Sequence, residues 1–275
     1  MLTVILSFLL TSAPLTVTDD GQVAAELVKE DFERLYVDRL LIDDEKLALQ
    51  MDILDEKMYQ KPVNAKLDDD GNIIQEKLGV ELDRTKFRQL FQRYFYEGTP
   101  PDKVELPGRS VYPKVDSELL AEIREHEIGR YVTTFKPGNE ERSRNIELAA
   151  EAINNHVVFP GERFSFNDVV GKRTEEKGYQ RAPVIVKGEL SEDIGGGICQ
   201  VSSTLYNAVD LKSIDITERY SHSRSVPYVP PGRDATISWY GPDFAFTNQH
   251  KQPILIRASA NDGHMEVQVL SAEPS

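Results

Sequence analysis

A run of three glycines at residues 195–197, followed two residues later by the only cysteine of the 275 residues, constrains this chain most. Consecutive glycines mark a close approach of the backbone or a left-handed backbone conformation. Beyond them Val201, Leu205 and Val209 recur every fourth residue, which predicts a helix that begins near Cys199 and buries one face. A thiol at that position lies among unpaired N–H groups at the positive end of the helix dipole, and both favour the nucleophilic thiolate.

The same cysteine is also compatible with a packing role, because free cysteine is among the most buried residue types. The polar residues that follow it, Gln200, Ser202, Ser203 and Thr204, favour a functional site over a plain core helix. A single cysteine excludes an intrachain disulfide and a multi-cysteine zinc site.

The formal net charge of −14 argues against a nucleic-acid partner and against electrostatic adhesion to an anionic lipid surface. Most of the excess negative charge lies in residues 1–125, which indicates two units of different character. We therefore expect an apolar leader at residues 1–18, a small module at residues 19–114 and a larger domain at residues 115–275.

The N-terminus resembles a signal peptide. Residues 2–10 form an apolar run, and Thr11, Ser12 and Ala13 resemble a processing site of small residues. The run is too short to span a bilayer as it stands, and no Lys or Arg precedes it. We expect an exported protein whose membrane contact is restricted to this leader, if the leader is retained.

The first module is expected to mix helices and short strands. Apolar residues predict a helix over residues 27–58 with a buried face made of Phe32, Leu35, Val37, Leu40 and Leu41. The elements expected after it are a strand at 62–67, a turn at 69–72, a strand at 73–74, a helix at 83–96 capped by Asp83 and a strand at 104–106.

The second domain is expected to be rich in strands. Helices are predicted at residues 116–127, at 139–156 and after Cys199, and strands at 129–135, 162–166, 183–186, 215–220, 235–240, 244–247, 254–258 and 265–270. The expected fold class is α+β: a small α+β module, then a β-rich domain with a helix that begins at the single cysteine.

Several long motifs in the second half resemble the VanW family. In chain order they are Phe159-Pro160-Gly161-Glu162, Phe164-Ser165-Phe166-Asn167, Val170-Gly171-Lys172-Arg173-Thr174, Gly178-Tyr179, the run from Gly195 to Asn207, Tyr220-Ser221-His222-Ser223 and Gly232-Arg233-Asp234-Ala235-Thr236. Residues 19–114 resemble the peptidoglycan-binding module that often precedes this domain. The resemblance implies an exported, cell-wall-associated bacterial protein with peptidoglycan or muropeptides as partners, from a family named after a vancomycin-resistance cluster and without a settled activity.

The order Cys199, His222, Asp234 suggests a thiol triad, with His222 at the end of one expected strand and Asp234 before another. The roles would be nucleophile, general base and orienter of the imidazole. An oxyanion would be received by the backbone of Gly195, Gly196 and Gly197 and by the Gln200 side chain. Each residue also has a structural interpretation: His222 as a loop histidine and Asp234 as a turn cap or partner of Arg233.

The residues expected to contact a ligand are Ser202, Ser203, Arg173, Arg233, Tyr228 and Trp239. Arginine suits a substrate carboxylate, and aromatic rings suit a sugar or peptide groove, although packing in a sheet is the more common role of such rings. No spaced set of ligands supports a metal site, and no cofactor is expected.

Two functions remain open on the sequence. The first is a cell-envelope protein that binds peptidoglycan or its stem peptides through the VanW-like domain. The alternative is a cysteine-dependent hydrolase or acyl transferase that acts on peptidoglycan peptides with Cys199, His222 and Asp234.

Overall fold

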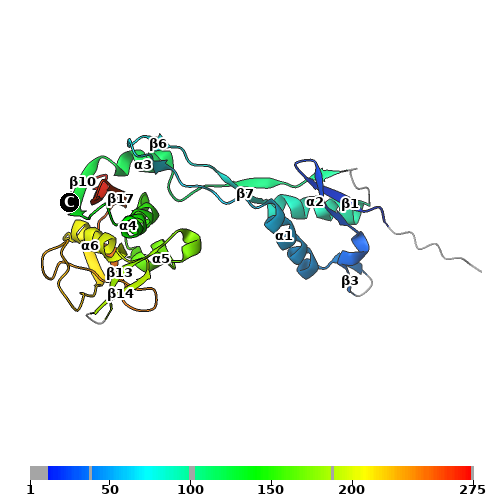
Figure 1. The fold of residues 1–275 in the computed structure, drawn as a ribbon. Coiled ribbons are helices and arrows are strands. Elements are labelled where there is room, and N and C mark those ends of the chain that lie inside the picture. Colours follow the sequence, from blue (N-terminus) through cyan, green and yellow to red (C-terminus); the bar gives the residue numbers. More distant parts are fainter. Residues whose placement is uncertain (1–11, 37–38, 99–102, 187–188, 274–275) are drawn as a thin grey trace, which may run out of the picture. The chain divides into compact units, whose positions relative to one another are not determined.

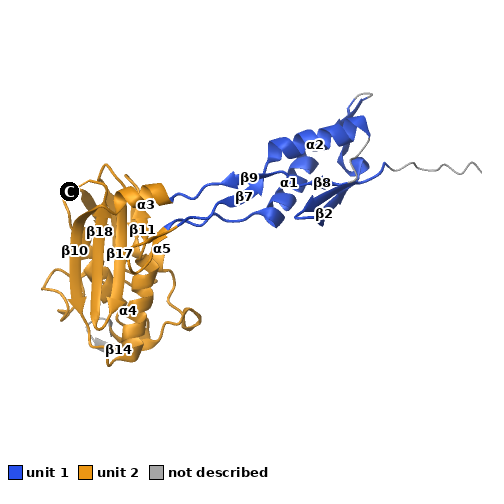
Figure 2. Ribbon diagram, turned by 90° about the horizontal axis from the view of Figure 1, so that it is seen from above, with its two compact units in different colours: residues 1–65, 75–116 blue, residues 66–74, 117–275 orange. Residues whose placement is uncertain are grey.

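The computed structural model describes residues 12–36, 39–98, 103–186 and 189–273. The chain is an α+β protein that forms two compact units, coloured separately in Figure 2. Unit 1 comprises residues 1–65 and 75–116, and unit 2 comprises residues 66–74 and 117–275. No helix among the described residues has both the length and the apolar composition that a bilayer crossing requires.

Unit 1 packs two helices, α1 (Asp44–Met58) and α2 (Arg84–Glu97), with short strands (Figure 1). Strand β1 (Leu15–Asp19) pairs antiparallel with β2 (Gln22–Leu27) and parallel with β8 (Val104–Glu105). The other elements are the 3-10 turn η1 (Lys29–Phe32), the hairpin β3 (Glu33–Tyr36) and β4 (Arg39–Ile42), and the pair β7 (Gly79–Leu82) and β9 (Gly108–Val111).

The predicted helix α2 is confirmed, and its cause is local. Asp83 accepts a hydrogen bond from the Lys86 N–H at the start of the helix, and Gly98 ends it in a left-handed conformation. Phe87 and Phe91 are completely buried in the core of unit 1. The helical spacing of these apolar residues therefore predicted both the element and its buried face.

The predicted helix over residues 27–58 is wrong in its first half. Helix α1 begins only at Asp44, because the Asp43 carboxylate accepts hydrogen bonds from the Glu45 and Lys46 N–H groups and caps it there. The preceding residues form the β3–β4 hairpin, in which Leu35 is 73% exposed. Of the other residues expected on the buried face, Phe32 is buried, Leu40 and Leu41 are exposed, and Val37 lies outside the described residues.

The expected leader overlaps the folded part of unit 1. Residues 1–11 lie outside the described residues, but residues 15–18 belong to strand β1. Leu15 is 1% exposed and Val17 is fully buried in the core. These apolar side chains are thus part of the folded unit.

Unit 2 is built on a four-stranded antiparallel sheet in the order β10-β18-β17-β11. Its strands are β10 (His126–Thr134), β18 (His264–Ser271), β17 (Ile254–Asn261) and β11 (His156–Val158). Helices α4 (Glu140–Ile153) and α6 (Ile198–Val209) pack against each other and against this sheet. Ile146, Ile153, Val201, Leu205 and Val267 are completely buried between them.

A second sheet completes this unit, in the order β12-β16-β15. Its strands are β12 (Arg163–Ser165), β16 (Ala245–Asn248) and β15 (Ile214–Glu218). The remaining elements are the helices α3 (Ser117–Ile123) and α5 (Phe166–Val170), the 3-10 turn η2 (Glu175–Lys177), and the hairpin β13 (Arg181–Val186) and β14 (Glu189–Ile194). Strand β14 and helix α5 had no counterpart among the predicted elements.

The hairpin β5 (Lys66–Leu67) and β6 (Ile73–Ile74) belongs to unit 2, although the sequence placed it within residues 19–114. Arg257 donates hydrogen bonds to the Leu67 and Asp68 carbonyls at 3.0 and 2.8 Å. Asn155 binds both the N–H and the carbonyl of Leu67. These contacts join residues distant in sequence, so local patterns give no sign of them.

The strand predicted at residues 235–240 does not form. The Ala235 N–H and carbonyl bind hydroxyl groups of Ser203 and Ser202 in place of a neighbouring strand. Ala235 and Ile237 are buried, but Trp239 is 40% exposed. The alternation of apolar and polar residues that predicted a strand therefore belongs to an irregular segment that lies along α6.

Candidate active site

Helix α6 begins at the glycine run, and Cys199 is its second residue. Gly197 caps the helix with a φ of +105°, a left-handed conformation that residues with a side chain rarely adopt. A Cβ on Gly196 would lie 2.6 Å from the Ala182 carbonyl carbon, so only glycine fits against this backbone. The predicted helix start and the close backbone approach are both confirmed.

In the first turn of α6, the backbone N–H group of Cys199 is left without a hydrogen-bond acceptor among the described residues. The Ile198 N–H bonds to the Gly195 carbonyl at 3.3 Å, and the Gln200 N–H bonds to the Gly197 carbonyl at 2.9 Å. Among the described residues, the Cys199 N–H has no acceptor. It is therefore a free donor beside the thiol.

Asn145 on helix α4 holds the glycine turn in place. Its side-chain N–H₂ donates to the carbonyls of Gly196 and Gln180, both at 2.9 Å, and its oxygen accepts from the Gln180 N–H at 2.8 Å. Asn145 is completely buried, and its bond to the Gly196 carbonyl is shielded from water. Sequence reasoning missed it; the only signal was an amide among the inward-facing residues of a predicted amphipathic helix.

His222 and Asp234 form a buried pair, with side chains 7% and 9% exposed. The Asp234 carboxylate accepts from the His222 backbone N–H at 2.6 Å and lies 2.7 Å from Nδ1 of the same residue. Because Nδ1 faces the carboxylate, Nε2 is the ring nitrogen left for another partner. That arrangement of imidazole and carboxylate is the one that a thiol or serine triad uses.

The Cys199 thiol lies at this pair. Its sulfur is 3.8 Å from the Thr236 hydroxyl and 3.6 Å from the Ile237 carbonyl. Burial raises the pKa of the thiol, but hydrogen bonds with His222 and the Ile237 backbone outweigh burial, and the pKa is lowered. The three residues predicted from chain order alone are thus brought together in unit 2.

The pKa values of the two partners shift in matching directions. Burial lowers the pKa of His222, but hydrogen bonds with Cys199 and Asp234 raise it above its ordinary value. Burial raises the pKa of Asp234, but the two hydrogen bonds from His222 lower it below its ordinary value. The site therefore favours a thiolate, an imidazolium and a carboxylate.

Three of the expected ligand contacts serve the structure instead. Ser202 and Ser203 are completely buried, and their hydroxyls bind the Ala235 backbone and the Cys199 carbonyl. Arg233 is paired with the Asp210 carboxylate at 2.6 Å and also binds the Asn207 side chain. The bonds from Ser202 and Ser203 to Ala235 and from Arg233 to Asn207 hold the segment that carries Asp234 against α6, because each joins the two elements.

Gln200 is not available as an oxyanion donor. Its side-chain N–H₂ donates to the Thr133 hydroxyl at 2.9 Å and to the Thr134 carbonyl at 3.0 Å. Its oxygen accepts from the Arg142 guanidinium at 2.7 Å. The amide is 1% exposed, and all of these partners lie on other elements of the core.

The remaining expected contacts differ in exposure. Tyr228 is half-buried, and burial and the Cys199 thiolate raise the pKa of its hydroxyl. Trp239 is exposed and packs edge-on against the Tyr240 ring, which is 87% exposed. Arg173 is 8% exposed and donates to the Asn167 side chain at 2.7 Å.

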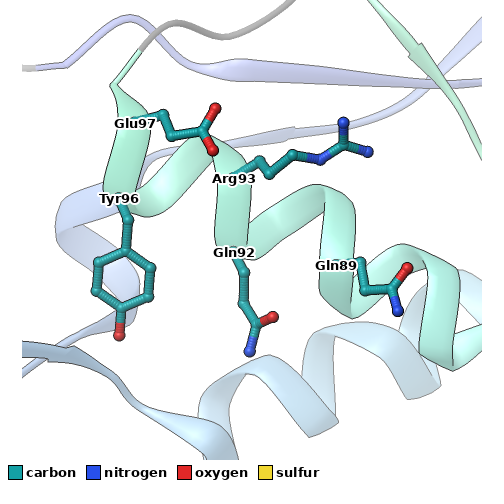
Figure 3. A pocket seen from close by; sticks show the side chains of 5 residues that line it. All are labelled: Gln89, Gln92, Arg93, Tyr96 and Glu97. Atoms are coloured by element: carbon teal, nitrogen blue, oxygen red, sulfur yellow. The ribbon is translucent and has the colours of Figure 1, made fainter.

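Unit 1 has a concave and an acidic feature of its own. A hollow of about 460 Å³ lies on α2 in unit 1. Figure 3 shows the side chains that line it, Gln89, Gln92, Arg93, Tyr96 and Glu97, and none of these is a nucleophile beside a base. Among the described residues, the carboxylates of Asp19, Asp20 and Glu105 approach within 4.8 Å of one another, the spacing of metal ligands. Such acidic groups on a surface are common without an ion, so this cluster identifies no metal centre.

Comparison of the sequence with known proteins identifies a family. A family model described as VanW like protein matches residues 141–270. The uncharacterized protein YoaR of Bacillus subtilis (strain 168) is 54% identical over 259 residues, which cover 94% of this chain and 85% of the relative. The vancomycin B-type resistance protein VanW of Enterococcus faecalis (strain ATCC 700802 / V583) is 32% identical over 99 residues, which cover 34% of this chain and 36% of the relative. No solved structure matches. The matched segment contains the glycine run and all three residues of the thiol site, and the chain belongs to the VanW family.

Proposed function

We propose that this protein is a cysteine-dependent acyl-transfer enzyme of the bacterial cell envelope, a hydrolase or transferase that acts on the stem peptides of peptidoglycan. The observation that carries the proposal is the buried His222–Asp234 pair at the Cys199 thiol. A thiol that only packs a core needs neither a histidine nor a carboxylate that orients it.

Each group has a defined task in this reaction. The Cys199 thiolate attacks a peptide carbonyl, and the Cys199 N–H at the start of α6 donates to the oxygen that becomes negative. His222 gives its proton to the leaving amine as the C–N bond breaks, which leaves a thioester on Cys199. His222 then removes a proton from water in a hydrolase, or from an amine in a transferase, and the thiolate is released.

The location and partners rest on more general observations. The apolar residues 2–10 favour export, and a relative is named for vancomycin resistance. The net charge of −14 disfavours nucleic acids and anionic lipids as partners. Peptidoglycan in the cell wall is the partner that fits these observations and the acyl chemistry, with membrane contact restricted to a retained leader.

Binding of peptidoglycan without catalysis is the second candidate. The observation that favours it is the pair of exposed rings of Trp239 and Tyr240, whose centroids are 6.5 Å apart. Trp239 lies two residues after Ile237, whose carbonyl contacts the thiol. Exposed aromatic rings beside a site suit a sugar or peptide ligand.

The test is incubation of the full chain with soluble muropeptides that carry intact stem peptides, followed by mass spectrometry of the products. The matched variants are Cys199→Ser and Cys199→Ala, with circular dichroism and thermal melting to establish that both fold. We expect the wild type to shorten or join stem peptides and both variants to leave them unchanged. A wild type that binds muropeptides without changing them, with equal binding by Cys199→Ala, would replace catalysis with the binding function.

A further inference from the structure

Two arginines reach the start of α6 through the space that the glycine run leaves open. A Cβ on Gly195 would lie 3.2 Å from Cγ of Arg173, and a Cβ on Gly197 would lie 2.7 Å from Cγ of Arg142. Both arginines also interact electrostatically with the Cys199 thiolate. The missing side chains of Gly195 and Gly197 therefore leave room for Arg173 and Arg142 beside the candidate nucleophile.

Neither cation has a carboxylate partner among the described residues. The hydrogen bonds of their guanidinium groups go to neutral amides, from Arg142 to Gln200 and from Arg173 to Asn167, both at 2.7 Å. Nε and Nη2 of Arg173 are buried and have no hydrogen-bond partner in the described part of the chain. By contrast, carboxylates pair with the exposed or half-buried arginines Arg84, Arg88, Arg109, Arg130, Arg144, Arg163 and Arg233.

The carboxylates beside this site are engaged elsewhere. Asp234 accepts both hydrogen bonds from His222. Asp243, which interacts electrostatically with Arg173, accepts from the Ser165 hydroxyl and from the Asn167 and Phe244 N–H groups. A buried guanidinium without a counter-ion is costly, and burial lowers the pKa of Arg173 for that reason. An anion from outside the chain would relieve this cost.

We propose that Arg142 and Arg173 form a carboxylate subsite beside Cys199, which binds the α-carboxylate of the last residue of a peptide substrate. Arg142 is half-buried and Arg173 is nine-tenths buried, so both cations are partly withdrawn from water. The planar guanidinium fork matches a carboxylate with two parallel hydrogen bonds. The subsite rests on the proposed function and narrows its substrate to peptides with a free C-terminus.

The position of the subsite defines which bond is broken. With the terminal carboxylate on the two arginines, the amide that precedes the last residue is presented to the Cys199 thiolate. The thiolate forms a bond to the carbonyl carbon, the C–N bond breaks, and His222 protonates the nitrogen of the released C-terminal amino acid. Water then hydrolyses the thioester, or the amine of a second peptide takes the acyl group, and no oxidant or reductant is needed.

The test compares two alkylating reagents of nearly equal size, anionic iodoacetate and neutral iodoacetamide, on the full chain. Cys199 is the only cysteine, so the mass gain reports this one thiol. The ratio of the two rates is independent of the thiolate fraction, because both reagents attack the same thiolate. The variants are Arg142→Gln, Arg173→Gln and Arg173→Lys, and the control is Arg144→Gln, an exposed residue of the same helix as Arg142 that pairs with Glu147.

We expect the folded wild type to prefer iodoacetate by about tenfold relative to the urea-unfolded chain, and to saturate with it. The preference should fall in Arg142→Gln and Arg173→Gln and persist in Arg144→Gln. If Arg173→Gln does not fold, Arg142→Gln and Arg173→Lys decide. Rapid alkylation by both reagents without a preference would overturn the subsite and leave the proposed nucleophile intact. A thiol that neither reagent reaches until the protein unfolds would overturn the nucleophile, and the subsite with it.

Discussion

Replacing His222 with alanine removes the ring that contacts the Cys199 thiol and leaves the rest of the triad in place. The Asp234 carboxylate keeps its hydrogen bond from the backbone N–H of residue 222, because that bond does not involve the side chain. The loop that carries the histidine therefore retains its anchor. Only the bond between the ring and the carboxylate, and the contact between the ring and the thiol, are lost.

The size of the effect follows from the contact that is lost. A hydrogen bond to a charged group contributes about 1.5–3 kcal/mol, and one pKa unit corresponds to about 1.4 kcal/mol. The His222 side chain is 7% exposed, so water screens the interaction little. We expect the pKa of the Cys199 thiol to rise in His222→Ala, because the side-chain interaction that lowers it is removed. At a pH below the pKa of the thiol in both proteins, alkylation should slow by about tenfold to a hundredfold.

The assay is timed alkylation with iodoacetamide from pH 5 to pH 10, with intact-mass detection. In the wild type, the rate should rise with pH through a pKa below the unperturbed value of about 8.5. His264→Ala, which removes an exposed histidine of strand β18, is the control and should leave the profile unchanged. A wild-type pKa at or above 8.5 that His222→Ala does not alter would refute the thiolate–imidazolium pair.

Two further predictions concern the stability of the site. Gly196→Ala should lower the free energy of unfolding by about 1–3 kcal/mol, because the added Cβ meets the Ala182 backbone. The control Gly138→Ala should not lower it, because no atom lies within 4 Å of the added Cβ. Equal melting temperatures of the two variants would contradict the close approach at Gly196. Asp234→Asn should cost about 1–3 kcal/mol at pH 7. Because the pKa of Asp234 is lowered, its contribution to the free energy of unfolding is present above about pH 4 and is lost as the pH falls through the lowered pKa. In urea unfolding, the stabilities of the variant and the wild type should therefore become equal in acid. A difference that persists in acid would assign the loss to packing.

The elements that sequence predicted well are those with local causes. Helix α4 begins where the Asn139 side chain accepts from the Arg142 N–H, and helix α2 begins at the Asp83 cap. Their buried residues repeat with helical spacing, so a few consecutive positions define both the element and its inner face. Helix α6 was predictable for the same reason.

The prediction failed where apolar spacing had another cause. Leu35 and Leu40 lie at spacings that suit a helix, but they face solvent in a hairpin that ends at the Asp43 cap. Residues 235–240 alternate as a strand would, but side chains of α6 satisfy part of their backbone. In the first case the hairpin pairing and the Asp43 cap decide the element, and in the second case hydrogen bonds to distant residues of α6 decide it.

The candidate site also has residues that the sequence suggested and residues that only the structure shows. Chain order suggested Cys199, His222 and Asp234, because each residue type has a known task in a thiol triad. The residues that hold the site, Asn145 and Arg142, were not suggested, since a polar residue on a helix face gives no information about its distant partner. Only the folded chain shows that both contact the glycine run or its neighbour Gln200.

The three glycines illustrate why the run is more informative than its single members. A side chain at Gly195 would meet the Arg173 side chain, one at Gly196 would meet the Ala182 backbone, and one at Gly197 would meet the Arg142 side chain. Each glycine lies against a different neighbour, so the missing side chain has a separate steric reason at each position. Gly195 and Gly197 are both left-handed, with φ of +86° and +105°, so the turn into α6 explains a glycine at these two positions. Gly196 is not left-handed, and its missing side chain lets the run lie against the Ala182 backbone. In the proposed subsite, the same missing side chains at Gly195 and Gly197 leave room for the two cations beside the nucleophile.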